Sequence, residues 1–142
     1  MKRLLAALCL CSLATVAHAE IMQKFGPFEI HYNALTTDSL LPEVARNYKI
    51  ERSKTRGLVT MSVLKKNKLG ALTPVPAKVT VYVTNLTRQL ANVNMREVRE
   101  GAAIYYLGEF RVAPPDTLTF TATVEVPGEL KQEMTFDQKF FK

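Results

Sequence analysis

Glu29, His31 and Asn33 form the group of side chains whose types and spacing are best suited to catalysis or ligand binding. In an extended strand these three residues share one face, with successive members about 7 Å apart at a rise near 3.3 Å per residue. An imidazole beside a carboxylate can bind a ligand or act as a base. A polar outer face on a half-solvated strand explains the same pattern without a ligand. We therefore take Glu29, His31 and Asn33 as candidate binding residues and assign no catalytic residue.

A basic segment follows further along, where Arg52, Lys54 and Arg56 alternate. Guanidinium groups fit the oxygens of a phosphate, for instance that of a lipid or lipopolysaccharide. A solvated basic segment before a strand is the alternative explanation. Arg52 and Arg56 are the candidate binding residues here.

The methionines suggest a copper-type carrier as a further alternative, because thioethers suit Cu(I) and His31 supplies an imidazole. The methionines concerned are Met22, Met61, Met95 and Met134. Three of them, all except Met22, fall on faces that we predict to point inward, where methionine fills gaps in a core. We assign no metal site and no cofactor.

The first nineteen residues have the pattern of a secretory signal peptide. A basic tip is followed by an apolar run too short to span a bilayer, and then by Ala17-His18-Ala19. We expect cleavage after Ala19 and a periplasmic domain of residues 20–142 with no transmembrane segment. Cleavage removes Cys9 and Cys11, so disulfides and Cys-His nucleophiles are excluded within the mature chain.

Other enzyme and nucleic-acid classes find no support either. His31 is the one histidine left after cleavage, and no Gly-x-Ser-x-Gly elbow occurs in the sequence. The formal net charge of +6 falls to +4 without Lys2 and Arg3. No basic repeat with interleaved aromatic residues is present, so we expect no nucleic-acid partner. Because no catalytic group is recognisable, we do not expect an enzyme either.

Period-two alternation of apolar and polar residues runs through most of the chain and predicts about seven short strands. They are expected near residues 28–35, 57–66, 77–83, 91–101, 104–112, 118–126 and 130–141. One short helix is predicted near residues 40–48, capped by Asp38 or Ser39, with Leu41 among its buried residues. The pattern is that of a single all-β domain, an antiparallel β-sandwich of immunoglobulin-like type.

Two details of the strand arrangement follow from local signals. The segment 101–127 is predicted to be a hairpin that turns at Pro114-Pro115. The strand at 26–35 is predicted to be a sheet edge or to carry a bulge, because Gly26-Pro27 interrupts its entry.

Three stretches resemble an uncharacterised family of bacterial exported proteins, domain of unknown function 4426. They are Phe25 to Ala45, Glu51 to Leu64, and Arg99 to Val112. The most specific parts are Glu29-Ile30-His31-Tyr32-Asn33-Ala34, Leu41-Pro42-Glu43-Val44-Ala45, and Arg99-Glu100-Gly101 leading to Tyr105-Tyr106. The resemblance implies one secreted β domain and carries no activity with it.

The sequence thus favours a non-catalytic interaction module that contacts an envelope protein or polymer, because an edge strand can accept a partner strand. The alternative is a periplasmic carrier of a small ligand or metal that uses His31 and nearby groups.

Overall fold

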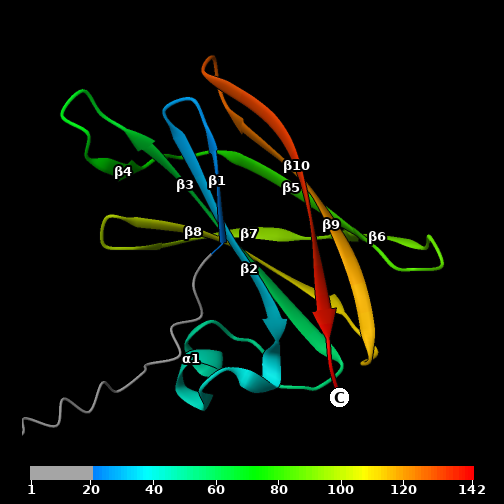
Figure 1. The fold of residues 1–142 in the computed structure, drawn as a ribbon. Helices are drawn as coiled ribbons and strands as arrows, with labels where there is room; N and C mark the ends of the chain where they lie inside the picture. Colours follow the sequence, from blue (N-terminus) through cyan, green and yellow to red (C-terminus); the bar gives the residue numbers. More distant parts are fainter. Residues whose placement is uncertain (1–20) are drawn as a thin grey trace, which may run out of the picture.

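Two antiparallel sheets, packed face to face, account for most of residues 21–142, the part of the chain that this computed structural model describes (Figure 1). The predicted antiparallel β-sandwich is confirmed, although ten strands replace the expected seven. The expected signal peptide, residues 1–19, lies outside the described residues.

The larger sheet, sheet A, has the strand order β1-β2-β3-β8-β7, and β4 pairs with β3 beyond the end of β8. Its strands are β1 (Ile21–Phe25), β2 (Phe28–Thr36), β3 (Arg56–Lys66), β4 (Leu72–Pro74), β7 (Met95–Glu100) and β8 (Ala103–Arg111). The smaller sheet, sheet B, has the order β10-β9-β5-β6. Its strands are β5 (Lys78–Thr84), β6 (Leu90–Val93), β9 (Asp116–Val126) and β10 (Leu130–Phe140).

The inward faces follow the sequence alternation closely. Ile30, Val59 and Phe120 are fully buried between the sheets. Phe120 stacks on Phe136 at a ring-centroid distance of 4.9 Å, and Phe110 meets Phe120 edge-on at 5.0 Å. Burial of apolar side chains such as these supplies most of the favourable free energy of folding, at about 25 cal/mol per Å2 of apolar surface.

The predicted hairpin at 101–127 is wrong in its pairing. β8 and β9 each bury the face that was expected, but β8 pairs with β3 and β7 in sheet A, whereas β9 pairs with β5 and β10 in sheet B. Two strands with matching apolar faces can meet across a sandwich as well as side by side, because alternation defines faces and not neighbours.

The single strand predicted at 91–101 is also two strands. β6 ends at Val93 in sheet B, and β7 begins at Met95 in sheet A, so the chain changes sheets at Asn94. Strands that cross from one sheet to the other at a bend are a known way to close the corner of a sandwich.

The strand at 26–35 is not the sheet edge. β1 pairs with it from Phe25↔Phe28 to Ile21↔Tyr32 and takes the edge position itself. The sequence missed β1 because its five residues carry no apolar alternation strong enough to stand out.

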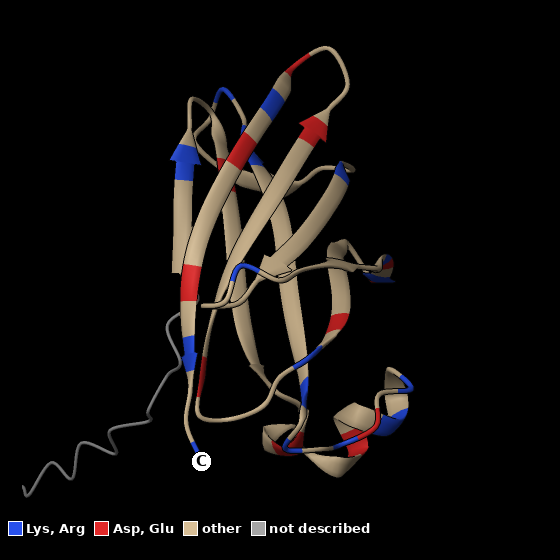
Figure 2. Cartoon of the chain, turned by 90° about the vertical axis from the view of Figure 1, so that its right-hand side faces the viewer, with Lys and Arg blue, Asp and Glu red and all other residues tan. Residues whose placement is uncertain are grey.

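Another edge strand, β10, is protected by charge. Its outward residues include Lys131, Glu133, Asp137 and Lys139, so two acidic residues lie between two lysines along the strand that ends near the C-terminus (Figure 2). Charged side chains on an edge strand discourage pairing with other chains.

The predicted helix is shorter than expected and is held differently. The helix α1 spans Pro42–Asn47, after the 3-10 turn η1 (Thr37–Ser39). Its N-cap is Leu41, without a side-chain cap hydrogen bond, so the expected cap by Asp38 or Ser39 is wrong. Leu41 is 70% exposed rather than buried, because a residue at the N-cap lies outside the helical face that contacts the sheet.

Around α1, the second apolar cluster of the molecule covers part of the outer face of sheet A. Ile50, Leu58 and Leu107 are its buried members, and Leu35, Leu40, Tyr48, Val98 and Tyr105 pack against them. The helix lies at one end of sheet A and β4 at the other (Figure 1). The remainder of that outer face lies between them.

Candidate functional site

Glu29 and His31 sit on the outer face of sheet A, as the sequence predicted. The Nε2 atom of His31 lies 3.1 Å from Oε2 of Glu29, and Nζ of Lys24 on β1 lies 3.9 Å from Oε1 of the same carboxylate. Glu29 is only 8% exposed. Buried carboxylates are rare unless they are partnered, so this charge has a fixed environment and is not part of an ordinary solvated face.

The register of the sheet places further side chains beside this pair. Met22 on β1 and Ser62 on β3 are both direct cross-strand partners of His31. Asn33 is the partner of Thr60 one step further along β2 and β3. Paired residues in antiparallel strands have Cβ atoms about 4.5–5.5 Å apart, so these side chains form two neighbouring rows across the sheet.

Two small cavities occupy these rows. One, of about 170 Å3, is lined by His31, Ser62, Tyr105 and Pro74 among others. The other, of about 210 Å3, is mostly apolar and lies under α1, with Asn33 and Thr60 in its lining. Tyr105 lines both cavities, which links them. We call this concave surface between α1 and β4, together with Glu29, which contacts His31, the outer-face site; the residues that line it include His31, Asn33, Thr60, Ser62 and Tyr105.

The wall that α1 supplies is fixed to sheet A by side chains of β7. The Tyr48 hydroxyl donates a hydrogen bond to the Glu100 carboxylate, and the Arg96 guanidinium donates one to the Tyr48 carbonyl. The bond to Glu100, aided by burial, raises the pKa of Tyr48. These contacts tie the segment after α1 to the edge of sheet A.

Arg52, a predicted anion ligand, is engaged by the backbone. Its Nε donates to the Leu40 carbonyl and its Nη2 to the Asp38 carbonyl, both at 2.8 Å. Thr37, which is fully buried, also accepts from the Ser53 amide at 2.8 Å. Arg52 therefore holds the turn before α1 in place.

Arg56 belongs to a different region from His31. It lies six residues before Ser62 on β3, or about 20 Å along the strand. Its Nη1 is 3.6 Å from Glu109 and its Nη2 is 3.6 Å from Glu51. The five predicted binding residues thus lie in three places. Glu29, His31 and Asn33 belong to the outer-face site, Arg52 holds the turn before α1, and Arg56 lines a second pocket.

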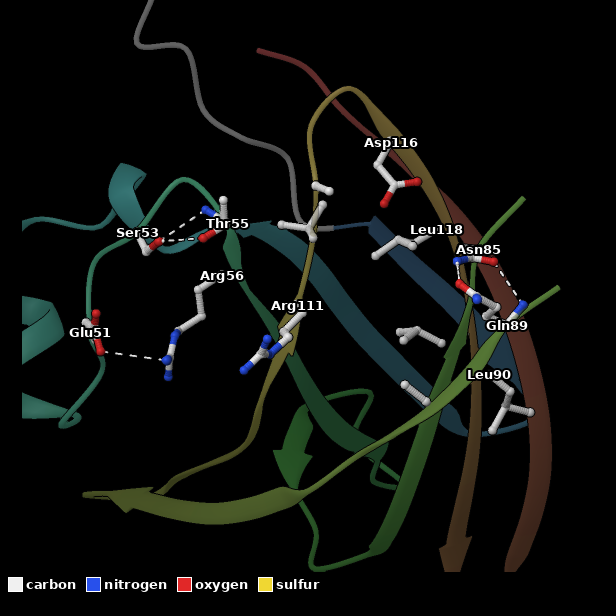
Figure 3. A pocket seen from close by; sticks show the side chains of 14 residues that line it. Glu51, Ser53, Thr55, Arg56, Asn85, Gln89, Leu90, Arg111, Asp116 and Leu118 are labelled. Atoms are coloured by element: carbon white, nitrogen blue, oxygen red, sulfur yellow. Dashed lines mark hydrogen bonds and ion pairs between the residues drawn. The ribbon is translucent and has the colours of Figure 1, made fainter. Parts of the chain in front are cut away.

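This second pocket, the end pocket, has a volume of about 610 Å3 and lies where β3 begins and β8 ends. Arg56 and Arg111 are direct cross-strand partners and stand side by side in Figure 3. Asp116 and Leu118 of β9 lie across from them, with the loop residues Asn85 and Gln89 nearby. Sequence analysis missed Arg111, since nothing before the register is known connects it to Arg56.

The methionines divide as their faces predict. Met61 and Met134 are buried, and Met95 packs against the core, whereas Met22 is 36% exposed beside His31. Within residues 21–142, no three His, Cys, Asp or Glu side chains are grouped as a metal site would require. Among these four methionines, Met22 is the cross-strand partner of His31.

The sequence from residue 22 to residue 142 matches the family described as a domain of unknown function, DUF4426. The chain belongs to the DUF4426 family. A crystal structure of a DUF4426 family protein from Pseudomonas aeruginosa PAO1 is similar at 35% identity and a TM-score of 0.72. The match covers 86% of this chain and 94% of that one.

The DUF4426 fold also resembles that of a more distant protein, FetP of uropathogenic Escherichia coli strain F11. FetP expressed in the periplasm matches at 12% identity and a TM-score of 0.61, over 86% of this chain and 93% of that one. A copper-bound FetP variant matches at 13% and 0.61, over 86% and 95%. At this identity the likeness concerns the fold alone. No curated protein sequence matches this DUF4426 chain.

The described part of this DUF4426 chain has no helix with the length and hydropathy needed to cross a membrane.

Proposed function

We propose that this DUF4426 domain is a non-catalytic binding module of the bacterial cell envelope, and that the outer-face site captures its partner, an envelope protein or polymer. The observation that carries the proposal is the concave surface between α1 and β4, where the buried carboxylate of Glu29 is held beside His31. A site with a few placed polar groups beside an apolar cavity suits recognition.

The lining indicates what the partner presents. The cavity under α1 has walls of Leu35, Val44, Ile50 and Leu107 and accepts an apolar group. His31, Ser62 and Asn33 supply hydrogen-bonding groups next to it. The export signal expected at residues 1–19 supports a periplasmic location for this binding.

Site-specific photo-crosslinking in the native cell tests the proposal. A photoreactive residue at Ser62 should give one defined crosslinked product, whereas the same residue at Thr80, exposed on β5 of sheet B, should give none. Combined replacement Glu29→Ala, His31→Ala and Asn33→Ala should abolish the product. Thr60→Arg, which fills the site without removing any of the three or the photoreactive residue, should do the same.

Circular dichroism and thermal unfolding establish that both variants remain folded. An undiminished product in folded Thr60→Arg protein, or equal crosslinking from Thr80, would rule out the outer-face site.

A second candidate, a metal carrier of copper type, is favoured by one specific observation. Met22 is the register partner of His31, so a thioether, an imidazole and the Glu29 carboxylate are close together on β1 and β2. Soft and borderline ligands of this kind suit Cu(I). The fold shared with the copper-bound FetP variant adds support at the level of architecture.

Competitive Cu(I) titration separates the two candidates. A carrier should lose at least tenfold in affinity with either Met22→Leu or His31→Ala, and should keep its affinity with Asn33→Ala. Copper affinity that is unchanged in the first two variants would exclude this set of ligands.

A further inference from the structure

The end pocket contains two cations that the fold places together against ordinary electrostatic preference. Arg56 and Arg111 are direct partners in the antiparallel pairing of β3 and β8. Like charges at such positions destabilise a sheet, because their side chains share one face at short range. A compensating negative charge is therefore expected beside them.

The carboxylates of the protein compensate only one of the two arginines. Arg56 has Glu51 and Glu109 at 3.6 Å each, distances typical of an ion pair and longer than a good hydrogen bond. Arg111 makes no ion pair with any residue in the described part of the chain, and it is exposed. Its guanidinium donors are available to a ligand.

The more exposed of the two carboxylates is easily displaced. The Glu51 side chain is 72% exposed, and exposed ion pairs contribute little to stability. Glu109 is less exposed, at 34%, and holds Arg56 from the other side. An incoming anion can therefore replace Glu51 while Glu109 continues to position Arg56.

The rest of the pocket orients such an anion. Asp116 stands on the opposite wall (Figure 3). Its Oδ1 accepts a hydrogen bond from the Thr117 amide at 2.8 Å. A negative group is repelled by that wall and drawn to the arginines. The Asn85 amide nitrogen donates to the side-chain oxygen of Gln89 at 2.8 Å, which makes the adjoining loop a firm wall.

From this geometry we infer that the end pocket is an anion-binding site, in which Arg56 and Arg111 together hold a phosphate group. Two guanidinium groups on adjacent strands present several N–H donors to tetrahedral oxygens, the arrangement that arginine favours for phosphate. The phosphate comes either from a lipid headgroup or from a soluble molecule. Arg56 lies about 20 Å along β3 from Ser62 of the outer-face site, and this inference does not depend on the proposed function.

Titration with inorganic phosphate, followed by amide NMR on protein produced from the full chain at constant ionic strength, tests the inference. Saturable shifts are expected at the amides of Thr55, Arg56, Arg111 and Val112. Arg111→Gln should weaken phosphate binding at least tenfold, because it removes a bidentate donor without leaving a buried partner. Glu51→Gln should strengthen binding about threefold, because Glu51 competes for Arg56.

Two control variants make the same charge changes elsewhere. Arg99→Gln, on β7, and Glu133→Gln, on the exposed face of β10, should leave the affinity unchanged. Shifts that do not saturate, or an Arg111→Gln variant that binds as the unmodified protein does, would overturn the site. So would weaker binding in Glu51→Gln.

Vesicles distinguish the two sources of phosphate. Sedimentation with phosphatidylglycerol vesicles that is lost in Arg111→Gln and reversed by free phosphate assigns a lipid headgroup to the site. Saturable phosphate binding without vesicle sedimentation assigns a soluble phosphate compound. Either result supports the arginine pair as the site.

Discussion

The Nε2 atom of His31 lies 3.1 Å from the Oε2 atom of Glu29, two residues earlier on the same strand. Both side chains are mostly buried, at 20% and 11% exposure respectively. A polar pair of this kind on the outer face of a sheet is shielded by its surroundings, so its interaction is less weakened by solvent than that of a surface pair.

A double-mutant cycle measures that interaction. His31→Ala leaves the Glu29 carboxylate short of one partner, so it should destabilise the protein more than it does when Glu29 is already alanine. We expect a coupling free energy of about 1 kcal/mol from urea unfolding of the four proteins. Additive effects of the two substitutions would show that the contact contributes nothing to stability.

Tyr106 should link stability to alkaline pH. It is 5% exposed, and its hydroxyl oxygen accepts a hydrogen bond from the Ala77 amide at 2.7 Å. Burial is the main cause that raises the pKa of Tyr106 in the folded protein above its value of about 10 in the unfolded chain. The unfolded state therefore loses its proton first, and the free energy of unfolding should decrease above about pH 10.

Replacement Tyr106→Phe tests this linkage. Near neutral pH it should cost about 1–2 kcal/mol, because the Ala77 amide loses its acceptor. The alkaline decrease should be smaller in the variant than in the unmodified protein, as measured by urea unfolding at about pH 10.5. An equal decrease in both would contradict the role of Tyr106. Tyr82→Phe, half-exposed on β5, is the control for loss of a hydroxyl near neutral pH.

Gly57 is required by the ring of Phe110. A Cβ atom at position 57 would lie 2.2 Å from two ring carbons of Phe110. That ring is fixed by edge-on contacts with Phe120 at 5.0 Å and Phe140 at 5.7 Å, so it cannot withdraw. Gly57→Ala should destabilise the protein by about 1–3 kcal/mol through overpacking.

Shortening the ring should relieve that strain. In the Gly57→Ala/Phe110→Leu double variant, thermal unfolding should show less destabilisation than the sum of the single effects. If the double variant is destabilised by the full sum of the two single effects, the added methyl group does not clash with the Phe110 ring.

Arg52 should act on the local structure before α1. Arg52→Gln removes donors from the Asp38 and Leu40 carbonyls and should cost about 1 kcal/mol. Amide hydrogen exchange should become faster in residues 37–48 and stay unchanged in sheet B. Lys54→Gln, an exposed neighbour, is the matched control and should leave exchange as it is. Protection that persists in Arg52→Gln would show that the turn is held by Thr37 alone.

Much of the fold was predictable because alternation directly records burial. Phe28, Ile30 and Tyr32 point inward and Glu29 and His31 outward, as their order along the strand requires. The short helix near Pro42 was also signalled locally, although its cap and the exposure of Leu41 were not. These features depend on neighbours within a few residues, which the sequence shows.

The pairing of strands could not be predicted in the same way. The apolar alternation of β8 and β9 is the same whether the two strands pair within one sheet or face each other from opposite sheets. The local pattern therefore does not decide between these two arrangements. The same reason hid the sheet change at Asn94, whereas β1 was missed because its apolar alternation is weak.

By itself, then, the sequence determined the sandwich class, the inward faces of its strands and the clustering of Glu29, His31 and Asn33 on one face. Only the tertiary structure decided that Met22 and Ser62 flank His31, that Arg52 braces a turn, and that Arg56 meets Arg111. The physical reason is that which side of a strand a residue faces is set by the local backbone. Which strand lies beside it is set by how all the apolar faces are buried at once.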